Sequence, residues 1–183
     1  RDDLIDLFLG ICELKHKSLP ALRSIAVTTN GFLTDAVVST VENILPTFQK
    51  KGLDLVVVCA LDAVGALHNR IRNYPDAWPK VSKTLAELAL LRNRHPNLIV
   101  GLKTTILPLN IDELHKISKF AAAGGFFTII SPCIITEGRY LNPNRAKDLY
   151  FRPEDVRKMI EYFSNDQLRW RFHAAALVDF YKS

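Results

Sequence analysis

Four short apolar segments, separated by longer amphipathic ones, set the pattern of this chain. The apolar segments are residues 24–29 (SIAVTT), 53–59 (LDLVVVC), 98–106 (LIVGLKTTI) and 126–130 (FFTII). Their length and their β-branched content predict strands. Between and around them apolar residues recur at helical spacing, which predicts helices over 2–15, 34–50, 79–94, 110–123, 153–163 and 166–182. We expect a long loop or broken helix over 63–76 and a long loop over 131–152.

Strands that alternate with helices predict βαβ units and a parallel sheet. The simplest order is sequential, so we expect an α/β fold, specifically a partial (β/α) TIM-type barrel with about four parallel strands. The segments 53–59 and 98–106 are nearly continuous apolar runs, which is typical of strands buried on both faces. A doubly wound sheet is the alternative, but its phosphate-binding glycine pattern is absent. Gly124-Gly125 follows a predicted helix and is therefore expected to end it.

Composition narrows the class of protein. The 183 residues amount to one domain, and 48% hydrophobic residues can fill a sizeable core. The net charge of +5 is carried by scattered basic residues, which favours a solvated surface over a nucleic-acid partner. No apolar run approaches the roughly 20 residues of a membrane span, so we expect no membrane partner, and we expect no signal peptide. The cysteines, Cys12, Cys59 and Cys133, are few and widely spaced, which favours a reducing, cytoplasmic location.

Both ends of the chain lie directly on helix-forming sequence. Residues 1–14 (RDDLIDLFLGICEL) and 167–182 (QLRWRFHAAALVDFYK) lack the polar, Gly- or Pro-rich character of a domain boundary. We therefore expect residues 1–183 to be a single domain truncated at both ends, with residues 152–183 forming its C-terminal helices. A truncated sheet leaves the strand at 24–29 with an unpaired edge, so we also expect self-association through this edge.

Polar side chains follow each predicted strand at its C-terminal end. In a parallel sheet these ends share one edge, where α/β folds bind ligands and carry out chemistry. A lysine in an apolar strand is the least ordinary of these residues, because a buried ammonium without a partner is costly. The candidate binding residues are Thr29, Asn30, Asp62, Lys103, Thr104 and Ser131.

The order of three motifs resembles a known family. VTTNGF, VVVCALDAVGALHNRIRN and VGLKTTILPLNIDEL follow one another at the spacing seen in the MoaA-like group of the radical SAM superfamily. The opening RDDL is similar to the residues that follow that family's GGEP turn. The resemblance covers roughly residues 1–135. It implies that the four strands correspond to the third to sixth strands of a radical SAM barrel.

This resemblance implies a chemistry and its cofactors. Radical SAM enzymes use a [4Fe-4S] cluster to cleave S-adenosylmethionine (SAM) reductively, and the resulting radical attacks a small-molecule or peptide substrate. The family's CxxxCxxC and GGEP segments are not in this sequence, and the family's serine before Leu61-Asp62 is Ala60. We therefore expect the cluster and SAM in a longer parent protein, and neither cofactor bound to this chain, which by itself is expected to be inactive.

The resemblance also implies roles for the candidate residues. Thr29 and Asn30 would contact the methionyl part of SAM, Asp62 the ribose, Lys103 or Thr104 a carboxylate, and Ser131 the adenine. Each has a structural alternative, since Asn30-Gly31 is an ordinary turn pair and Asp62 can cap the following segment. We expect His68 to be a loop residue, Arg72 to form an ion pair, and Cys59 and Cys133 to be buried. We expect His95 to end a helix, and Glu137 and Arg139 to lie in a solvated loop.

Two further function classes stay open on the sequence. The first is an ordinary barrel enzyme, such as an aldolase that uses Lys103 as a Schiff-base lysine. The second is a non-catalytic binding module on the same scaffold.

Overall fold

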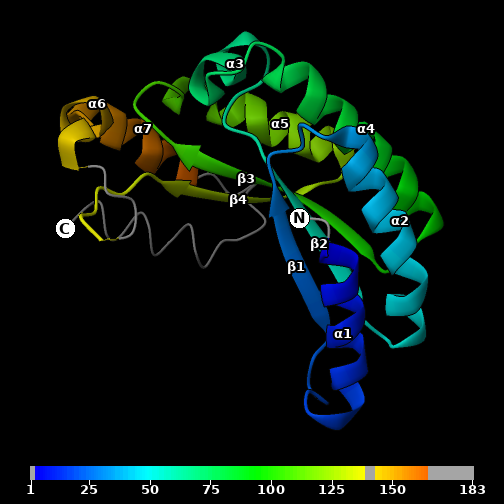
Figure 1. Cartoon of the computed structure of the whole chain (residues 1–183). Helices are drawn as coiled ribbons and strands as arrows, with labels where there is room; N and C mark the ends of the chain where they lie inside the picture. The colour runs from blue at the N-terminus through cyan, green and yellow to red at the C-terminus, as the bar shows by residue number, and fades with distance from the viewer. Residues whose placement is uncertain (1–2, 139–142, 165–183) are drawn as a thin grey trace.

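The structure is a computed structural model, and it describes residues 3–138 and 143–164. Strands and helices alternate along the chain, with two short 3₁₀ helices (η1, η2) in the connections (Figure 1). The elements are α1 (Leu4–Lys17), β1 (Ser24–Thr29), α2 (Thr34–Lys50), β2 (Asp54–Ala60), α3 (Ala66–Arg72), α4 (Ala77–Arg94), β3 (Leu98–Ile106), η1 (Ile111–Glu113), α5 (Leu114–Gly124), β4 (Phe127–Pro132), η2 (Pro143–Arg145), α6 (Ala146–Leu149) and α7 (Pro153–Ser164).

The sheet confirms the predicted four parallel strands in sequential order. Its order is β1-β2-β3-β4, and each neighbouring pair is parallel. Because the order never reverses, right-handed crossovers place every connecting helix on the same side of the sheet. Figure 1 shows these helices along the convex side of a curved sheet. Among the described residues β1 and β4 each pair on one side only, so the sheet is open at both ends.

The core lies between the sheet and the helices. The strand residues that face the helices include Leu55, Val57 and Leu102, each at most 1% exposed. Helices α2 and α4 pack on them with apolar residues at helical spacing, which is the pattern that predicted both helices. Those that are at most 1% exposed include Ile44, Leu45, Phe48, Val81, Leu85, Leu88 and Leu91. Full burial of one such side chain contributes about 1.5–3 kcal/mol, so this layer dominates the stability of the fold.

The opposite side of the sheet has no described helix packed on it, and we call it the open face. It is formed by Ala26, Thr28, Val56, Val58, Ala60, Ile99, Gly101, Lys103, Thr105, Phe127, Ile129 and Ser131, which alternate with the helix-facing residues. Ile99 and Ile129 are 39% and 41% exposed. The expectation that the third strand is buried on both faces is therefore wrong for Ile99, because the nearly continuous apolar run did not show what covers each face.

Several local predictions have clear outcomes. Residues 63–76, expected as a long loop or broken helix, contain the short helix α3, which ends at Asn73 in the left-handed conformation (φ 48°) before α4 begins at Ala77. The expected loop over 131–152 instead contains η2 and α6. Gly125 ends α5 with φ at 63°, as expected, and Arg92 donates to the carbonyls of Gly124 and Gly125.

Other predictions fall outside what the structure describes or concern membranes. The helix expected over 166–182 lies outside the described residues. Within residues 3–138 and 143–164, no helix has both the length and the apolar character needed to cross a bilayer.

Candidate functional site

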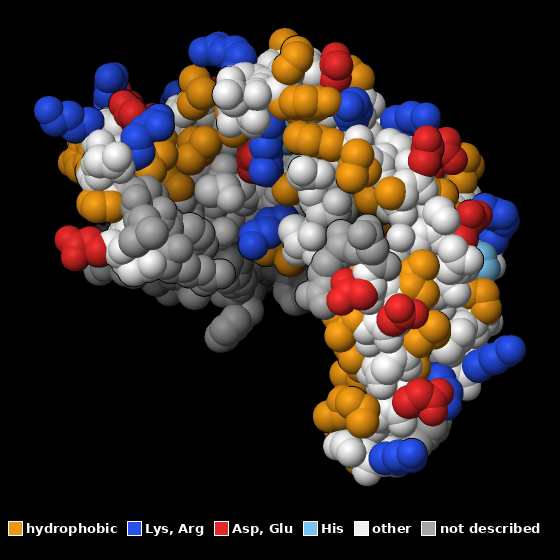
Figure 2. All heavy atoms as spheres, viewed as in Figure 1, with side chains coloured by type: hydrophobic (Ala, Val, Ile, Leu, Met, Phe, Trp, Pro, Cys, Tyr) orange, Lys and Arg blue, Asp and Glu red, His pale blue; other side chains and the backbone are white. Residues whose placement is uncertain are grey.

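The C-terminal edge of the sheet brings polar side chains from two strands onto the open face. Lys103 of β3 lies in register between Ala60 of β2 and Ile129 of β4, and Thr105 lies beside Ser131. Lys103 is exposed, and it forms no hydrogen bond or ion pair with any described residue. Figure 2 shows a hollow below the helix layer, with Lys or Arg side chains (blue) reaching into it. In the part of the chain that the structure describes, the open face therefore presents an ammonium without a partner and two hydroxyls, with apolar residues around them.

Asp62 follows β2 and is 4% exposed. Its Oδ2 lies 2.7 Å from Arg72 Nη2, and its Oδ1 accepts a hydrogen bond from the Thr105 backbone N–H at 3.0 Å. The ion pair expected for Arg72 is thus confirmed. The alternative in which Asp62 caps the next helix is wrong, because the N-cap of α3 is Gly65 and no side chain bonds to it. Asp62 instead ties the β2–α3 connection to the end of β3.

His68 and Asn110 complete this group of contacts, which we call the rim network (Asp62, His68, Arg72, Thr105 and Asn110). His68 Nδ1 accepts a hydrogen bond from the Asp62 backbone N–H at 3.2 Å. Asn110 Nδ2 donates to the carbonyls of Asp62 (2.7 Å) and Thr105 (3.0 Å). Both side chains are 0% exposed. The network joins the ends of β2 and β3 through side chains that lie far apart in the sequence.

The expectation that His68 is a loop residue is wrong, since it lies inside α3 and is fully buried. Burial, together with repulsion from Arg72, lowers the pKa of His68 to about 4, although Asp62 acts in the opposite direction. The imidazole is therefore neutral at pH 7, and the bond accepted by Nδ1 places its proton on Nε2. Its neighbours Ala66, Asn69 and Arg70 do not form an apolar stripe at helical spacing, so the sequence did not indicate that His68 faces the core.

Thr29 and Asn30 form the turn after β1. Thr29 Oγ1 accepts a hydrogen bond from Gly31 N at 3.1 Å, and Asn30 Oδ1 accepts one from Phe32 N at 3.1 Å. Gly31 has φ at 73°, a conformation that glycine adopts without strain. The structural alternative for Asn30 is thus present, and its amide N–H groups remain available as donors toward a ligand.

Thr104 lies on the other side of β3 from Lys103. It is 0% exposed, and its hydroxyl donates to the Leu61 carbonyl at 2.6 Å. Ser131, in contrast, is half-buried on the open face in the edge strand β4. Of the six candidate residues, Lys103 and Ser131 therefore share the open face, and Thr104 faces the helices. Thr29, Asn30 and Asp62 form hydrogen bonds that fix the connections after β1 and β2.

The thiols do not form a cluster site. Cys59 is 0% exposed, and burial raises its pKa to about 12, as expected for a structural thiol. Burial also raises the pKa of Cys12 in α1 and of Cys133 after β4. Cys133 is only half-buried, so the expected burial holds for it in part. Among the described residues, no three side chains of His, Cys, Asp or Glu come together at a metal-binding distance. These cysteines do not fit a [4Fe-4S] cluster.

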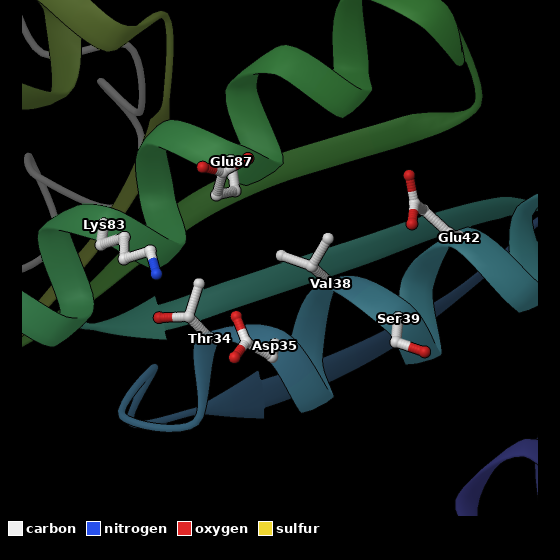
Figure 3. Close-up of a pocket in the computed structure, with 7 residues that line it drawn as sticks. All are labelled: Thr34, Asp35, Val38, Ser39, Glu42, Lys83 and Glu87. Carbon is white, nitrogen blue, oxygen red and sulfur yellow. The ribbon is translucent and has the colours of Figure 1, made fainter.

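A second concavity lies on the outer surface of the helix layer, between α2 and α4 (Figure 3). It is an open groove of about 350 Å³, lined by Thr34, Asp35, Val38, Ser39, Glu42, Lys83 and Glu87. Glu42 already pairs with Arg94 at 3.3 Å. The groove is separated from the open face by the sheet itself, so it shares no residue with the candidate site.

The remaining sequence candidates lie apart from this site. His95 is the C-cap residue of α4, as expected. Glu137 is exposed in the segment after β4. Arg139 lies outside the described residues. A scan of the sequence against protein-family models finds no match, and a search of curated proteins finds no significant relative.

Proposed function

We propose that this chain is the central part of a radical SAM barrel and that its open face binds SAM in the longer protein. The observation that carries the proposal is Lys103, whose ammonium lies on the open face near the C-terminal strand ends and has no partner among the described residues. The sequential parallel order with helices on one side is the arrangement of successive strands in a (β/α) barrel. In such a barrel the open face would become the interior.

The side chains present suit parts of SAM to different degrees. Lys103 suits the carboxylate of the methionyl group, and the Ser131 hydroxyl lies one row further along the same face. Asp62 has a donor on each oxygen already, so a ribose hydroxyl would have to use its remaining acceptor capacity. Thr104 is not included, because its hydroxyl is committed to the Leu61 carbonyl.

The [4Fe-4S] cluster, unlike SAM, is not proposed to bind this chain, because the described cysteines do not fit it. No reductive step is therefore assigned to residues of this chain. Their proposed part is to bind and orient SAM and to keep water from it.

Titration of the parent protein with SAM, after cluster loading, tests this function. Removal of the Lys103 ammonium in Lys103→Met should weaken SAM binding roughly ten- to a hundredfold, the effect of one charge-assisted hydrogen bond. Lys83→Met is the matched control, since Lys83 lies in the α2–α4 groove on the far side of the sheet. Asp62→Asn is a weaker probe, because it also disturbs Arg72. Equal SAM affinity in Lys103→Met and the unmodified parent would refute the assignment.

A Schiff-base enzyme is the second candidate. The observation in its favour is that Lys103 lies in register between the apolar residues Ala60 and Ile129, and that no described Asp or Glu pairs with it. Borohydride reduction in the presence of a carbonyl substrate would trap a covalent adduct on Lys103 if this function holds.

A further inference from the structure

Thr105 lies on a part of β3 that extends past the end of the neighbouring strand. Strand β2 ends at Ala60, which pairs with Lys103, whereas β3 continues to Ile106. The backbone groups of Lys103 face β2, because Leu61 N donates to Lys103 O. These groups alternate along a parallel strand, so those of Thr105 face the same side, beyond the end of β2. They therefore need partners from outside the sheet.

The side chains of Asp62 and Asn110 supply these partners. Asp62 Oδ1 accepts a hydrogen bond from Thr105 N at 3.0 Å, and Asn110 Nδ2 donates to Thr105 O at 3.0 Å. Asn110 is 0% exposed, its Nδ2 also donates to the Asp62 carbonyl, and its Oδ1 accepts from Leu107 N. The amide therefore has no freedom to turn away, and Thr105 stays extended. Alternation along β3 puts the Thr105 hydroxyl on the open face, opposite to that of Thr104.

The Thr105 hydroxyl has a second hydroxyl beside it. Thr105 pairs in register with Ser131 of β4, so the two residues lie roughly 5 Å apart on the open face. Both are half-buried, and neither hydroxyl bonds to any described residue. Lys103 lies two residues earlier on the same face of β3, roughly 7 Å along the strand. Its flexible four-carbon stem can bring the ammonium to the level of the two hydroxyls.

The charge around these three residues suits a negatively charged group. In the described strands, Lys103 is the only charged residue of the open face near the C-terminal ends, and no described residue pairs with it. Asp54 alternates onto the same face but lies at the opposite end of β2. The Asp62 carboxylate is already paired with Arg72 at 2.7 Å. A positive charge and two hydroxyl donors match the acceptor oxygens of a carboxylate or a phosphate.

We propose that Lys103, Thr105 and Ser131 form an oxyanion-binding site on the open face, in which the backbone contacts of Thr105 fix the position of its hydroxyl. The sequence suggested Thr104 for such a role, whereas the structure assigns it to the next residue, Thr105. The site rests on the proposed function in using the open face for ligands, but it does not require SAM to be the ligand. Two sources of the oxyanion fit: the carboxylate of SAM and an acidic group of the substrate.

Titration of the 183-residue chain with inorganic phosphate, followed by proton–nitrogen correlation NMR at constant ionic strength, tests the site. The amide shifts of Thr105 and Ser131 should saturate with phosphate but not with chloride. Thr105→Val removes the hydroxyl and keeps the branched shape and the backbone bonds, so it should weaken phosphate binding roughly three- to tenfold. Thr105→Ser should restore most of the affinity. Thr28→Val, on the same face in β1, is the matched control and should bind phosphate like the unmodified chain.

Competition in the parent protein identifies the source of the oxyanion. If phosphate lowers the affinity for SAM, and Thr105→Val lowers it as well, the bound group is the SAM carboxylate. If the phosphate-dependent shifts persist at saturating SAM, the bound group belongs to the substrate.

Two results would overturn the site. One is that phosphate causes no saturable shift beyond that caused by chloride. The other is that Thr105→Val, with the unfolding free energy of the unmodified chain, binds phosphate as tightly as Thr28→Val. The SAM proposal fails separately. If Lys103→Met loses phosphate binding but the parent with this change keeps its SAM affinity, only the SAM assignment is refuted. If Lys103→Met weakens SAM binding while Thr105→Val keeps phosphate affinity, only the oxyanion site is refuted.

Discussion

His68 should make the stability of this protein depend on pH in a specific window. Its pKa is lowered from an ordinary value near 6.5 to about 4 in the folded state. Between these two values the unfolded chain binds a proton at this position that the folded chain does not. Stability contributed by the neutral imidazole is therefore fully present above about pH 6.5 and is lost as the pH falls toward 4.

The magnitude follows from the two pKa values. At pH 5 the proton linkage of His68 costs about 2 kcal/mol relative to pH 7, and below pH 4 it approaches about 3 kcal/mol. The structural reason is that protonation of Nδ1 breaks the bond from Asp62 N and places a second cation beside Arg72 in a site that is 0% exposed.

The assay compares urea unfolding at pH 7 and pH 5 for the unmodified chain and His68→Asn. The Asn side-chain oxygen can accept the bond from Asp62 N, but it does not titrate. The unmodified chain should lose about 2 kcal/mol more between the two pH values than His68→Asn does. Carboxylates common to both proteins cancel in this difference. His95→Asn, at the end of α4, should behave like the unmodified chain. Parallel pH profiles for the unmodified chain and His68→Asn would show that His68 does not carry the effect.

Three other expectations concern the turn after β1, a buried hydroxyl of β3 and the iron-sulfur cluster. Gly31→Ala should destabilise the fold by roughly 1–3 kcal/mol in urea unfolding. The reasons are that φ of Gly31 is 73° and that an added Cβ would lie 2.9 Å from Val81 Cγ2. Gly10→Ala is the control and should be neutral or stabilising, because a Cβ at Gly10 in α1 would meet open space. Thr104→Val should lower the free energy of unfolding by about 1–2 kcal/mol, because the buried Leu61 carbonyl loses its hydrogen bond. Thr104→Ser keeps a hydroxyl and should keep most of the stability. A Thr104→Val protein as stable as the original would argue against this bond. Anaerobic iron-sulfide reconstitution of this chain should give sub-stoichiometric iron, and about four irons per chain would contradict the poor fit of its cysteines.

The alternation of apolar and amphipathic segments determined the order of elements. Strands β1 and β3 were predicted with the bounds that the structure has, and α2 likewise, because their hydrophobic periodicity is strong and uninterrupted. The end of α5 was predicted from Gly124-Gly125 for a local reason. Gly125 takes the left-handed conformation there, which glycine adopts at little cost. Parallel strands in sequence order follow from the length of the connections.

Only the tertiary structure decided which of these residues share a surface. Lys103 and Thr104 are neighbours in the sequence and lie on opposite sides of β3, and the side that stays open depends on where the helices pack. Asp62, Arg72 and Asn110 are brought together by the β2–α3 and β3–α5 connections, and no local pattern encodes that contact. His68 is buried for the same reason: its environment is made by residues distant in the chain, so its lowered pKa is a property of the fold.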